Sequence, residues 1–478
     1  MSATVPARPR RRGFTRGAAA FAALLVSGAA VRLLAVLTYQ PIFLLQRDTY
    51  TYLSLAVRSI ETAPGFRPPL YPWLFVKPLL VADSLLVVAV TQHIVGMAMS
   101  AALYAAMRRL DVPPVPAALG VAPLLLDAYQ INIEHYLLAE TFFQGLLVCA
   151  FTLLVWWARP ALPVVGLAGL LLGLAALSRF VGIALLLPAL AYIALVGMGW
   201  RRAGILLVTF ALPLAGYSVW FKGSSDTLGV TDRNGFFLYG RVGSFADCPR
   251  FFVPVELRRF CFDLPPSERG SNFGFFSLQN AAELQRLPGV NGLLLEFSRR
   301  AILGQPVGYA QAVWGDFMRF FSTSPPPARE PYVRRWRFPR ELADADPHPF
   351  VVRHGGSAPS RLGFQSFGID PWGARRLRAY GAIFYTPGPL LGLLLLLGIA
   401  GSAVGTGDAR RRGLRGACLL FSSGGLLLLL FPVMITVYHF RYVLSALPLL
   451  GPAGALGATA IVGRARRSRG SLRAPRGR

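Results

Sequence analysis

The stretch GAAAFAALLVSGAAVRLLAVLTY, residues 17–39, is an apolar run of the length that crosses a bilayer as a helix. It leads into RDTYTYLSLA, residues 47–56, where Asp48 places a carboxylate close to the end of a membrane-length segment. A rigid, proline-rich stretch, RPPLYPW, then begins at Arg67. This order indicates a membrane helix that opens into a polar loop, and it makes Asp48 the first place to look for chemistry.

The composition of the whole chain is that of a membrane protein. Its 478 residues are 54% hydrophobic and 15% charged, whereas soluble domains carry about 25% charged residues. The formal net charge is +27, but the arginines cluster between apolar runs, which is typical of topology signals beside membrane spans. We therefore expect membrane lipid as a partner and no nucleic acid.

Ten apolar runs predict an all-α polytopic membrane protein with about ten transmembrane helices. The first run exceeds a signal-peptide core and shows no clear cleavage site, so we expect it to be retained as a span. The ten runs lie near residues 17–39, 84–107, 113–131, 136–157, 161–178, 181–199, 203–221, 382–404, 413–435 and 441–463.

The connections between the runs alternate in charge. Every second connection is rich in arginine, beginning with the N-terminal tail, and positively charged loops face the cytoplasm. The pattern predicts that both termini are cytoplasmic. It divides the chain into a basic tail, an N-terminal transmembrane region that includes a first outer loop at 40–83, a long mixed extracytoplasmic segment, a C-terminal transmembrane region and a second basic tail, at residues 1–16, 17–221, 222–381, 382–463 and 464–478.

Two cysteines, Cys248 and Cys261, lie in the long outer segment, thirteen positions apart. An extracytoplasmic compartment permits disulfides, and a bridge here would stabilise the segment by roughly 3 kcal/mol. We favour this pairing over two free thiols. The Cys and His spacings do not resemble a zinc site, and the sequence indicates no metal and no cofactor.

Asp48 is the candidate for acid–base chemistry. Asp48, Tyr52 and Ala56 recur every four residues, so they would share one face of a short helix at the membrane interface. This makes Tyr52 a candidate substrate contact. Aspartate also favours helix starts, and the spacing leaves capping and catalysis equally open for Asp48.

Polar residues inside the predicted spans need partners. Glu140 lies near the outer end of the fourth run, and an acid inside a membrane most often faces a cavity or a partner. It is either a substrate contact or half of a salt bridge to Arg32 or Arg179. Gln92 and His93, in the second run, are expected to form hydrogen bonds between helices.

Several basic residues collect at predicted outer helix ends, against the positive-inside trend. The guanidinium group of arginine offers a planar fork of donors that fits phosphate oxygens. The alternative for Arg441 is that its side chain snorkels to the interface. The candidate set for binding a phosphate is Arg67, Arg179, His439, Arg441 and Tyr442.

Five motifs follow one another along the chain. They are Asp48-x-x-x-Tyr-x-x-x-Ala, Arg67-Pro-Pro-Leu-Tyr-Pro, Glu140 early in a middle span, Ser178-Arg-Phe-Val-Gly, and His439-x-Arg-Tyr followed by Pro448. In this order they resemble the GT-C superfamily of integral-membrane glycosyltransferases. The chain is most similar to the bacterial branch related to protein O-mannosyltransferases and to the aminoarabinose transferase of lipid A, glycosyltransferase family 39. The resemblance covers the first seven spans and the last.

The resemblance implies an enzyme of the bacterial plasma membrane that takes a hexose or pentose from a polyprenyl-phosphate-linked sugar donor. The sugar would pass, on the extracytoplasmic face and usually with inversion, to a hydroxyl of a glycan, lipid or protein acceptor. By this similarity Asp48 is the general base, which must reach the hydroxyl proton directly or through one water. Thr49 stands where protein mannosyltransferases carry Glu, which argues against a protein acceptor in particular.

Other classes of membrane protein remain as alternatives. A lipid or glycan transporter or flippase would often show two related halves with polar residues at mid-membrane, whereas here the polar residues gather at the outer ends of the spans. An O-antigen ligase or polymerase would share the lipid-linked donor chemistry. A non-catalytic partner in a cell-envelope complex would not depend on Asp48.

Overall fold

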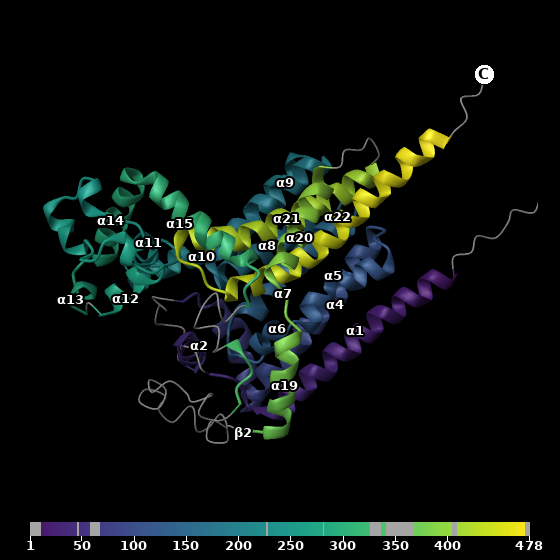
Figure 1. Ribbon diagram of the computed structural model, residues 1–478, viewed down its shortest axis with the longest axis horizontal. Coiled ribbons are helices and arrows are strands. Elements are labelled where there is room, and N and C mark those ends of the chain that lie inside the picture. Colours follow the sequence, from purple (N-terminus) through teal and green to yellow (C-terminus); the bar gives the residue numbers. More distant parts are fainter. Residues whose placement is uncertain are drawn as a thin grey trace, which may run out of the picture.

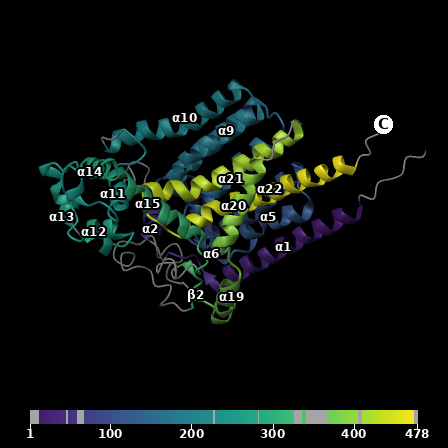
Figure 2. The same ribbon diagram turned by 45° about the horizontal axis from the view of Figure 1, so that its top comes forward.

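The chain folds almost entirely into helices. A computed structural model describes residues 11–44, 47–57, 67–225, 228–280, 282–325, 336–340, 368–403 and 409–473. Long helices run side by side as a bundle, and a smaller helical lobe lies beside one end of it (Figure 1 and Figure 2). Within the described residues the strands β1 (Tyr39–Gln40) and β2 (Gly368–Ile369) form one short antiparallel ribbon. The predicted fold class, an all-α membrane protein, is confirmed.

The helices of the bundle follow the apolar runs of the sequence. They are α1 (Arg11–Thr38), α4 (Leu86–Arg109), α5 (Pro114–Leu126), α6 (Ala128–Glu134), α7 (Glu140–Trp156), α8 (Leu162–Ser178), α9 (Leu186–Val196), α10 (Trp200–Ser225), α19 (Pro371–Ile383), α20 (Gly388–Ala403), α21 (Ala409–Ile435) and α22 (Arg441–Arg473). Short elements between them are α2 (Arg47–Val57), η1 (Tyr71–Val76), α3 (Lys77–Leu79), η2 (Leu80–Ala82) and η3 (Phe180–Leu185).

The smaller lobe is built by the described part of the long outer segment, and it too is helical. Its elements are α11 (Asn234–Val242), η4 (Cys248–Arg250), η5 (Val255–Phe260), η6 (Pro266–Glu268), α12 (Phe273–Asn280), α13 (Ala282–Gln285), α14 (Val290–Gly304), α15 (Pro306–Met318) and η7 (Arg319–Phe321).

Each of the ten predicted spans contains an apolar helix, but these helices differ in length. Among the described residues, five helices are individually long and apolar enough to cross a membrane, namely α1, α4, α10, α21 and α22. The number rises to seven if the bent pairs α5–α6 and α19–α20 each count as one span. The remaining apolar helices, including α7, α8 and α9, are shorter. The protein is therefore a multi-pass membrane protein, and the predicted number of ten spans is not confirmed.

The carboxylate of Asp127 binds backbone groups at the breaks in both bent helix pairs, α5–α6 and α19–α20, each of which is bent by 54°. Oδ1 of Asp127 accepts a hydrogen bond from the backbone N–H of Tyr129 at 2.9 Å, which caps the start of α6. Oδ2 accepts from the N–H of Thr386 at 2.6 Å, in the break between α19 and α20. The N–H of Ala128 donates to the carbonyl of Phe384 at 2.8 Å. Backbone groups freed by the two breaks are thus satisfied inside the protein, as a bilayer requires.

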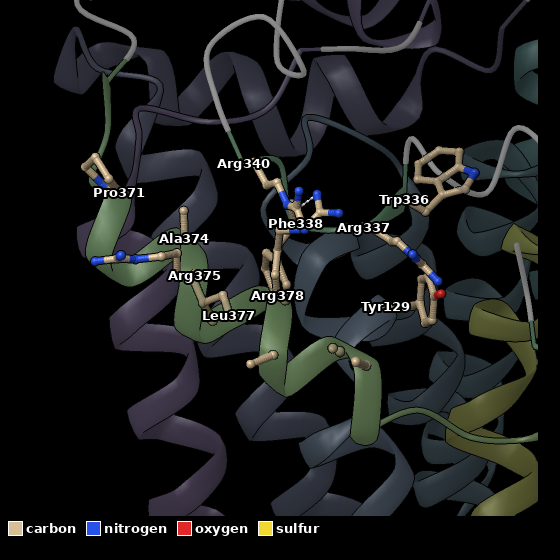
Figure 3. Close-up of a pocket in the computed structure, with 14 residues that line it drawn as sticks. Tyr129, Trp336, Arg337, Phe338, Arg340, Pro371, Ala374, Arg375, Leu377 and Arg378 are labelled. Carbon is tan, nitrogen blue, oxygen red and sulfur yellow. Dashed lines mark hydrogen bonds between the residues drawn. The ribbon is translucent and has the colours of Figure 1, made fainter.

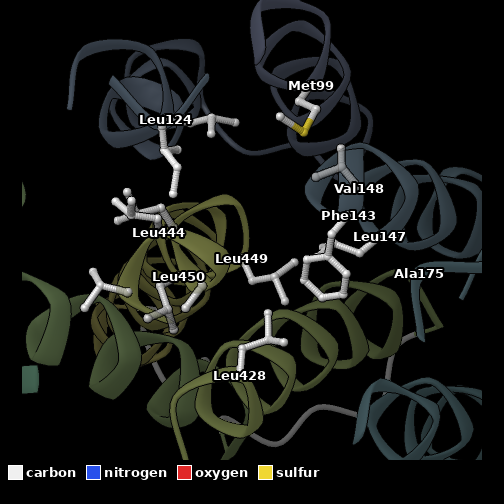
Figure 4. Close-up of a cluster of buried hydrophobic side chains, with 14 of the residues drawn as sticks. Met99, Leu124, Phe143, Leu147, Val148, Ala175, Leu428, Leu444, Leu449 and Leu450 are labelled. Carbon is white, nitrogen blue, oxygen red and sulfur yellow. The ribbon is translucent and has the colours of Figure 1, made fainter. Parts of the chain in front are cut away.

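The interior of the bundle combines large apolar side chains with close helix contacts. Phe143 of α7, Leu428 of α21 and Leu449 of α22 are fully buried and meet in the cluster drawn in Figure 4. Elsewhere the helices approach closely because they carry glycine. A Cβ atom on Gly457 of α22 would lie 2.0 Å from the carbonyl oxygen of Leu397 in α20. Small residues at such contacts are typical of packed membrane helices.

A buried polar network joins α1, α4 and α6. The guanidinium group of Arg32 binds Glu134 through two contacts, Nε to Oε2 at 2.8 Å and Nη2 to Oε1 at 2.9 Å. His93 Nδ1 lies 2.9 Å from Oε2 of the same carboxylate. Gln92 donates through Nε2 to the carbonyl of Tyr136 at 2.7 Å. The hydrogen bonds between helices that we expected of Gln92 and His93 are confirmed.

The lobe is held together by a disulfide and a buried ion pair, and the same ion pair makes hydrogen bonds to the bundle. Cys248 and Cys261 are bonded, with an S–S distance of 2.02 Å. Arg241 Nη1 lies 2.5 Å from Oδ2 of Asp316, and both side chains are almost completely buried. The same Oδ2 accepts a hydrogen bond from the N–H of Tyr438 at 3.1 Å. Asp316 therefore ties the lobe to the link between α21 and α22.

Parts of several predicted regions lie outside the described residues. These parts are residues 1–10 and 474–478 of the tails, 45–46 and 58–66 of the first outer loop, 226–227, 281, 326–335 and 341–367 of the long segment, and 404–408 of the C-terminal transmembrane region. Helix α1 begins at Arg11 and α22 continues to Arg473, so helical structure extends into both predicted tails. The side of the membrane on which each region lies stays a prediction.

Candidate active site

Asp48 lies in the first turn of α2, and two arginines distant in the sequence bind its carboxylate. Oδ1 accepts a hydrogen bond from Nη2 of Arg67, and Oδ2 accepts one from Nη1 of Arg441 at 3.0 Å. Arg441 opens α22, 393 positions after Asp48. The carboxylate is 13% exposed, so it lies near the surface of the cluster without being open to bulk water.

A second carboxylate shares Arg441. Glu140 opens α7 and is 1% exposed. Its Oε1 lies 3.0 Å from Nε of Arg441 and accepts a hydrogen bond from Nη1 of Arg179, which follows α8. Of the two partners considered for Glu140, the structure places Arg179 beside it, while Arg32 is bound to Glu134. Glu140 is thus part of a salt-bridge cluster.

Together these contacts form a row of alternating charges, which we call the carboxylate–arginine cluster. Its members are Arg67, Asp48, Arg441, Glu140 and Arg179. Three guanidinium groups face two carboxylates, so the cluster carries one excess positive charge when all are ionised. The members come from five separate parts of the chain: Asp48, Glu140 and Arg441 lie in the first turns of α2, α7 and α22, Arg179 follows α8, and Arg67 lies before η1.

His439 and Tyr442 lie next to this cluster but make different contacts. His439 is in the link before α22, and its Nδ1 accepts a hydrogen bond from the N–H of Arg441 at 3.3 Å. The hydroxyl of Tyr442 lies 3.2 Å from Oγ1 of Thr436. His439 therefore helps to orient the start of α22, and Tyr442 contacts the end of α21.

Tyr52 supports the site from one turn behind Asp48. Its buried ring packs edge-on against Tyr71 with ring centroids 5.2 Å apart. Tyr71 belongs to the proline-rich stretch after Arg67, and its hydroxyl donates to Oε1 of Gln92 in α4 at 2.9 Å. Two of the quoted motifs thus pack on one another, and this contact fixes α2 against the bundle.

The electrostatics of the site keep Asp48 ionised. Burial alone would raise the pKa of Asp48, but Arg67 and Arg441 outweigh this effect and lower it to about 2. Burial, reinforced by the charge of Arg441, lowers the pKa of His439 to about 3. His439 is therefore neutral at pH 7. Burial raises the pKa of Tyr52 to about 12, so Tyr52 is also neutral.

Trp336 belongs to this site although no sequence motif singles it out. The guanidinium carbon of Arg441 lies 5.6 Å from the centre of its ring, and the His439 ring meets it edge-on with centroids 5.8 Å apart. An isolated aromatic residue in an arginine-rich stretch gives no signal in the sequence. Trp336 meets Arg441 and His439 only after the chain has folded.

The arrangement provides a carboxylate that can accept a proton and guanidinium groups that can hold an anion. Within the described residues, no group of three or more His, Cys, Asp or Glu side chains is placed to hold a metal ion. Whether the protein uses a metal stays a prediction.

Comparisons with known proteins do not identify a family for this chain. No protein-family model matches the chain. No curated protein matches it either. A solved structure of an oligosaccharyltransferase from Archaeoglobus fulgidus, in the apo form, is similar at a TM-score of 0.41 and 14% identity over 96% of this chain. The chain spans about half of that protein, 52% of its length. A similarity at this level does not establish a function.

Proposed function

We propose that the protein is an integral-membrane glycosyltransferase that moves a sugar from a polyprenyl-phosphate donor to an acceptor hydroxyl on the extracytoplasmic face. The observation that carries this proposal is the pairing of Asp48 with Arg67 and Arg441. The two ingredients of the transfer, a base and a group of cations for the departing phosphate, lie within one cluster. The order of the sequence motifs, which resembles the GT-C superfamily, supports the same reaction.

In the proposed reaction Asp48 accepts the proton of the acceptor hydroxyl. The oxygen of that hydroxyl forms a bond to the anomeric carbon of the sugar, while the bond from this carbon to the phosphate oxygen breaks. The electron pair of the broken bond leaves with the polyprenyl phosphate. Guanidinium groups that are already in position stabilise the charge that develops there, and Arg67 and Arg441 are the nearest to Asp48.

A carboxylate with a pKa of about 2 is a weak base, so the resting cluster holds Asp48 in a restrained state. An incoming phosphate competes with the carboxylate for the same arginines, because both anions fit the guanidinium fork. As Arg67 and Arg441 turn toward the phosphate, the pKa of Asp48 rises toward its ordinary value and the carboxylate becomes a better base. Donor binding would thus activate the base.

Glu140 would hold Arg441 in place while the phosphate replaces Asp48 as its partner. It lies 3.0 Å from Nε of Arg441 and also binds Arg179. Arg441 can therefore give up its contact with Asp48 without losing its position. We include Arg179 among the groups that would neutralise the departing phosphate, and we assign His439, Tyr442 and Tyr52 to the walls of the site.

The proposed placement in the cell follows the charge pattern and the disulfide. Both termini would lie in the cytoplasm of a bacterial cell, and the carboxylate–arginine cluster would face outward together with the lobe. The bond between Cys248 and Cys261 supports this side, because structural disulfides persist in oxidising compartments. The acceptor would be a glycan, lipid or protein that reaches the outer face of the membrane.

The test is the substitution Asp48→Asn, which removes the base and keeps the shape of the side chain. We expect sugar transfer to fall by about a hundredfold or more, the usual contribution of a positioned base. Mass spectrometry of envelope glycans and lipid-linked sugars, in a deletion strain complemented with each variant, measures the transfer. The donor should accumulate in the Asp48→Asn strain.

Asp83→Asn is the matched control. Asp83 is exposed after η2 and has a left-handed backbone with φ of 52°, which asparagine also adopts readily. This variant should transfer sugar normally at the same level of membrane expression. Normal transfer by Asp48→Asn would refute the proposal, and equal losses in the two variants would show that Asp48 has no special role.

A further inference from the structure

A second basic site lies behind Trp336. A cavity of about 800 Å³ opens between the start of α6, the segment 336–340 and helix α19. Figure 3 shows its lining, with the side chains of α19 on one side and those of Tyr129 and Trp336 on the other. Four of the lining residues are arginines, and we call this cavity the arginine pocket; they are Arg337, Arg340, Arg375 and Arg378.

The charges of the arginine pocket have one sign. None of the described residues that line it is an aspartate or glutamate, in contrast to the carboxylate–arginine cluster. A cleft lined by one sign of charge concentrates ions of the opposite sign. Guanidinium groups bind phosphate and carboxylate through paired hydrogen bonds. The pocket therefore favours an anionic ligand.

The pocket shares a wall with the candidate active site. Trp336 lines the pocket, and the same ring contacts Arg441 and His439. Tyr129 also lines it, and its ring packs edge-on against Phe440 with centroids 4.9 Å apart. These rings separate the two groups of arginines. The arginine pocket and the carboxylate–arginine cluster are therefore neighbours that share Trp336 as a wall.

We propose that the arginine pocket binds an anionic group of the acceptor, of the phosphate or carboxylate type, while the acceptor hydroxyl reaches Asp48. This inference rests on the proposed glycosyltransferase function. It divides the two anions between two places, with the donor phosphate at Arg67 and Arg441 and the acceptor anion at the pocket. The aromatic rings of Tyr129, Trp336 and Phe338 line the same cavity and would contact the uncharged part of the acceptor.

The first measurement is the binding of pyrophosphate to the full-length, detergent-solubilised protein by isothermal titration calorimetry. Arg375→Gln removes one guanidinium group from an exposed position of α19, and we expect it to weaken binding about tenfold. Arg376→Gln is the matched control. Arg376 is equally a surface residue of α19, but it is not part of the lining and stacks on Trp372 at 3.3 Å from the ring centre. Its variant should bind pyrophosphate as the wild type does.

The second measurement distinguishes the two substrates with farnesyl phosphate as a short mimic of the donor. Arg67→Gln should weaken the binding of farnesyl phosphate, and Arg375→Gln should leave it unchanged. A tenfold loss of farnesyl phosphate binding in Arg375→Gln would assign the pocket to the donor and overturn the proposal. Absence of saturable pyrophosphate binding, or equal losses in Arg375→Gln and Arg376→Gln, would overturn it as well.

These readouts are independent of sugar transfer. If Asp48→Asn transferred sugar normally, the glycosyltransferase proposal would fail, whereas pyrophosphate binding that depends on Arg375 would still show an anion site in the pocket. If Asp48→Asn lost transfer and pyrophosphate did not bind, the proposed reaction would stand and the proposed acceptor site would fall.

Discussion

The substitution Arg67→Gln tests the central idea that arginines restrain Asp48 until the donor arrives. Arg67 donates to Oδ1 of Asp48, and its side chain is 24% exposed, so glutamine can take its place without leaving a buried cavity. The pKa of Asp48 is lowered from 3.8 to about 2, although burial opposes this change. At about 1.4 kcal/mol for each pKa unit, the difference corresponds to roughly 2 kcal/mol in favour of the carboxylate.

The charge of Arg67 is the largest single cause of this lowering, and Arg441 contributes through both its charge and its hydrogen bond. Without Arg67, burial is opposed mainly by Arg441, so we expect the pKa of Asp48 in the free enzyme to rise toward its ordinary value of 3.8. The variant should also lose most of the stability that this pair provides at pH 7. Because the folded-state pKa is the lower one, that stability is fully present above pH 3.8 and is lost as the pH falls toward 2.

The assay is the pH dependence of kcat/KM for sugar transfer, which reports the pKa of the base in the free enzyme. The wild type should show no acidic limb from Asp48 above pH 3.5, whereas Arg67→Gln should lose activity as the pH falls through about 4. Arg67→Lys keeps the charge beside Asp48, so its pH profile should stay close to that of the wild type. The shape of the profile is decisive, because Arg67 is also proposed to bind the donor. Superimposable profiles for Arg67→Gln and the wild type would refute the reasoning.

Two further predictions concern stability in detergent. Replacing both cysteines, Cys248→Ser with Cys261→Ser, should destabilise the lobe by about 3 kcal/mol, seen as faster proteolysis of the lobe; unchanged cleavage would mean that the bond contributes nothing. Gly96→Ala places a Cβ atom 2.3 Å from Oε1 of Glu134 and should displace this carboxylate from its buried pair. Breaking such a pair costs about 3 kcal/mol and should lower the midpoint of thermal unfolding. Gly204→Ala in α10, where a Cβ atom meets open space, should not lower it.

Local sequence patterns predicted the helices but not the bends between α5 and α6 and between α19 and α20. Apolar composition decides that a segment is helical in a membrane, because every backbone group must be satisfied within the segment. Each of the ten runs therefore contains a helix. The bends at α5–α6 and α19–α20 depend on Asp127, whose carboxylate serves two breaks more than 250 positions apart. A pattern read along the chain cannot reveal that shared contact.

The sequence likewise predicted the residues of the candidate site but not the contacts between them. The sequence marked Asp48, Glu140, Arg179 and Arg441 as polar residues near predicted helix ends, where burial in lipid would be costly. It did not indicate that Arg441 would lie between the two carboxylates, nor that Trp336 would separate this cluster from the arginine pocket. The residues that the sequence marked are the ones that form the cluster. Their pairing and the arginine pocket were found only in the folded chain.

By itself the sequence determined that this is an all-α membrane protein with polar residues gathered at the outer ends of its predicted spans. These properties follow from composition and spacing over about 20 residues, the thickness of a bilayer. Only the tertiary structure decided which charges meet, because Asp48 and Arg441 are separated by 393 positions. Electrostatic contacts act over a few ångströms, and the packing of α2, α7 and α22 is what brings these groups within that distance.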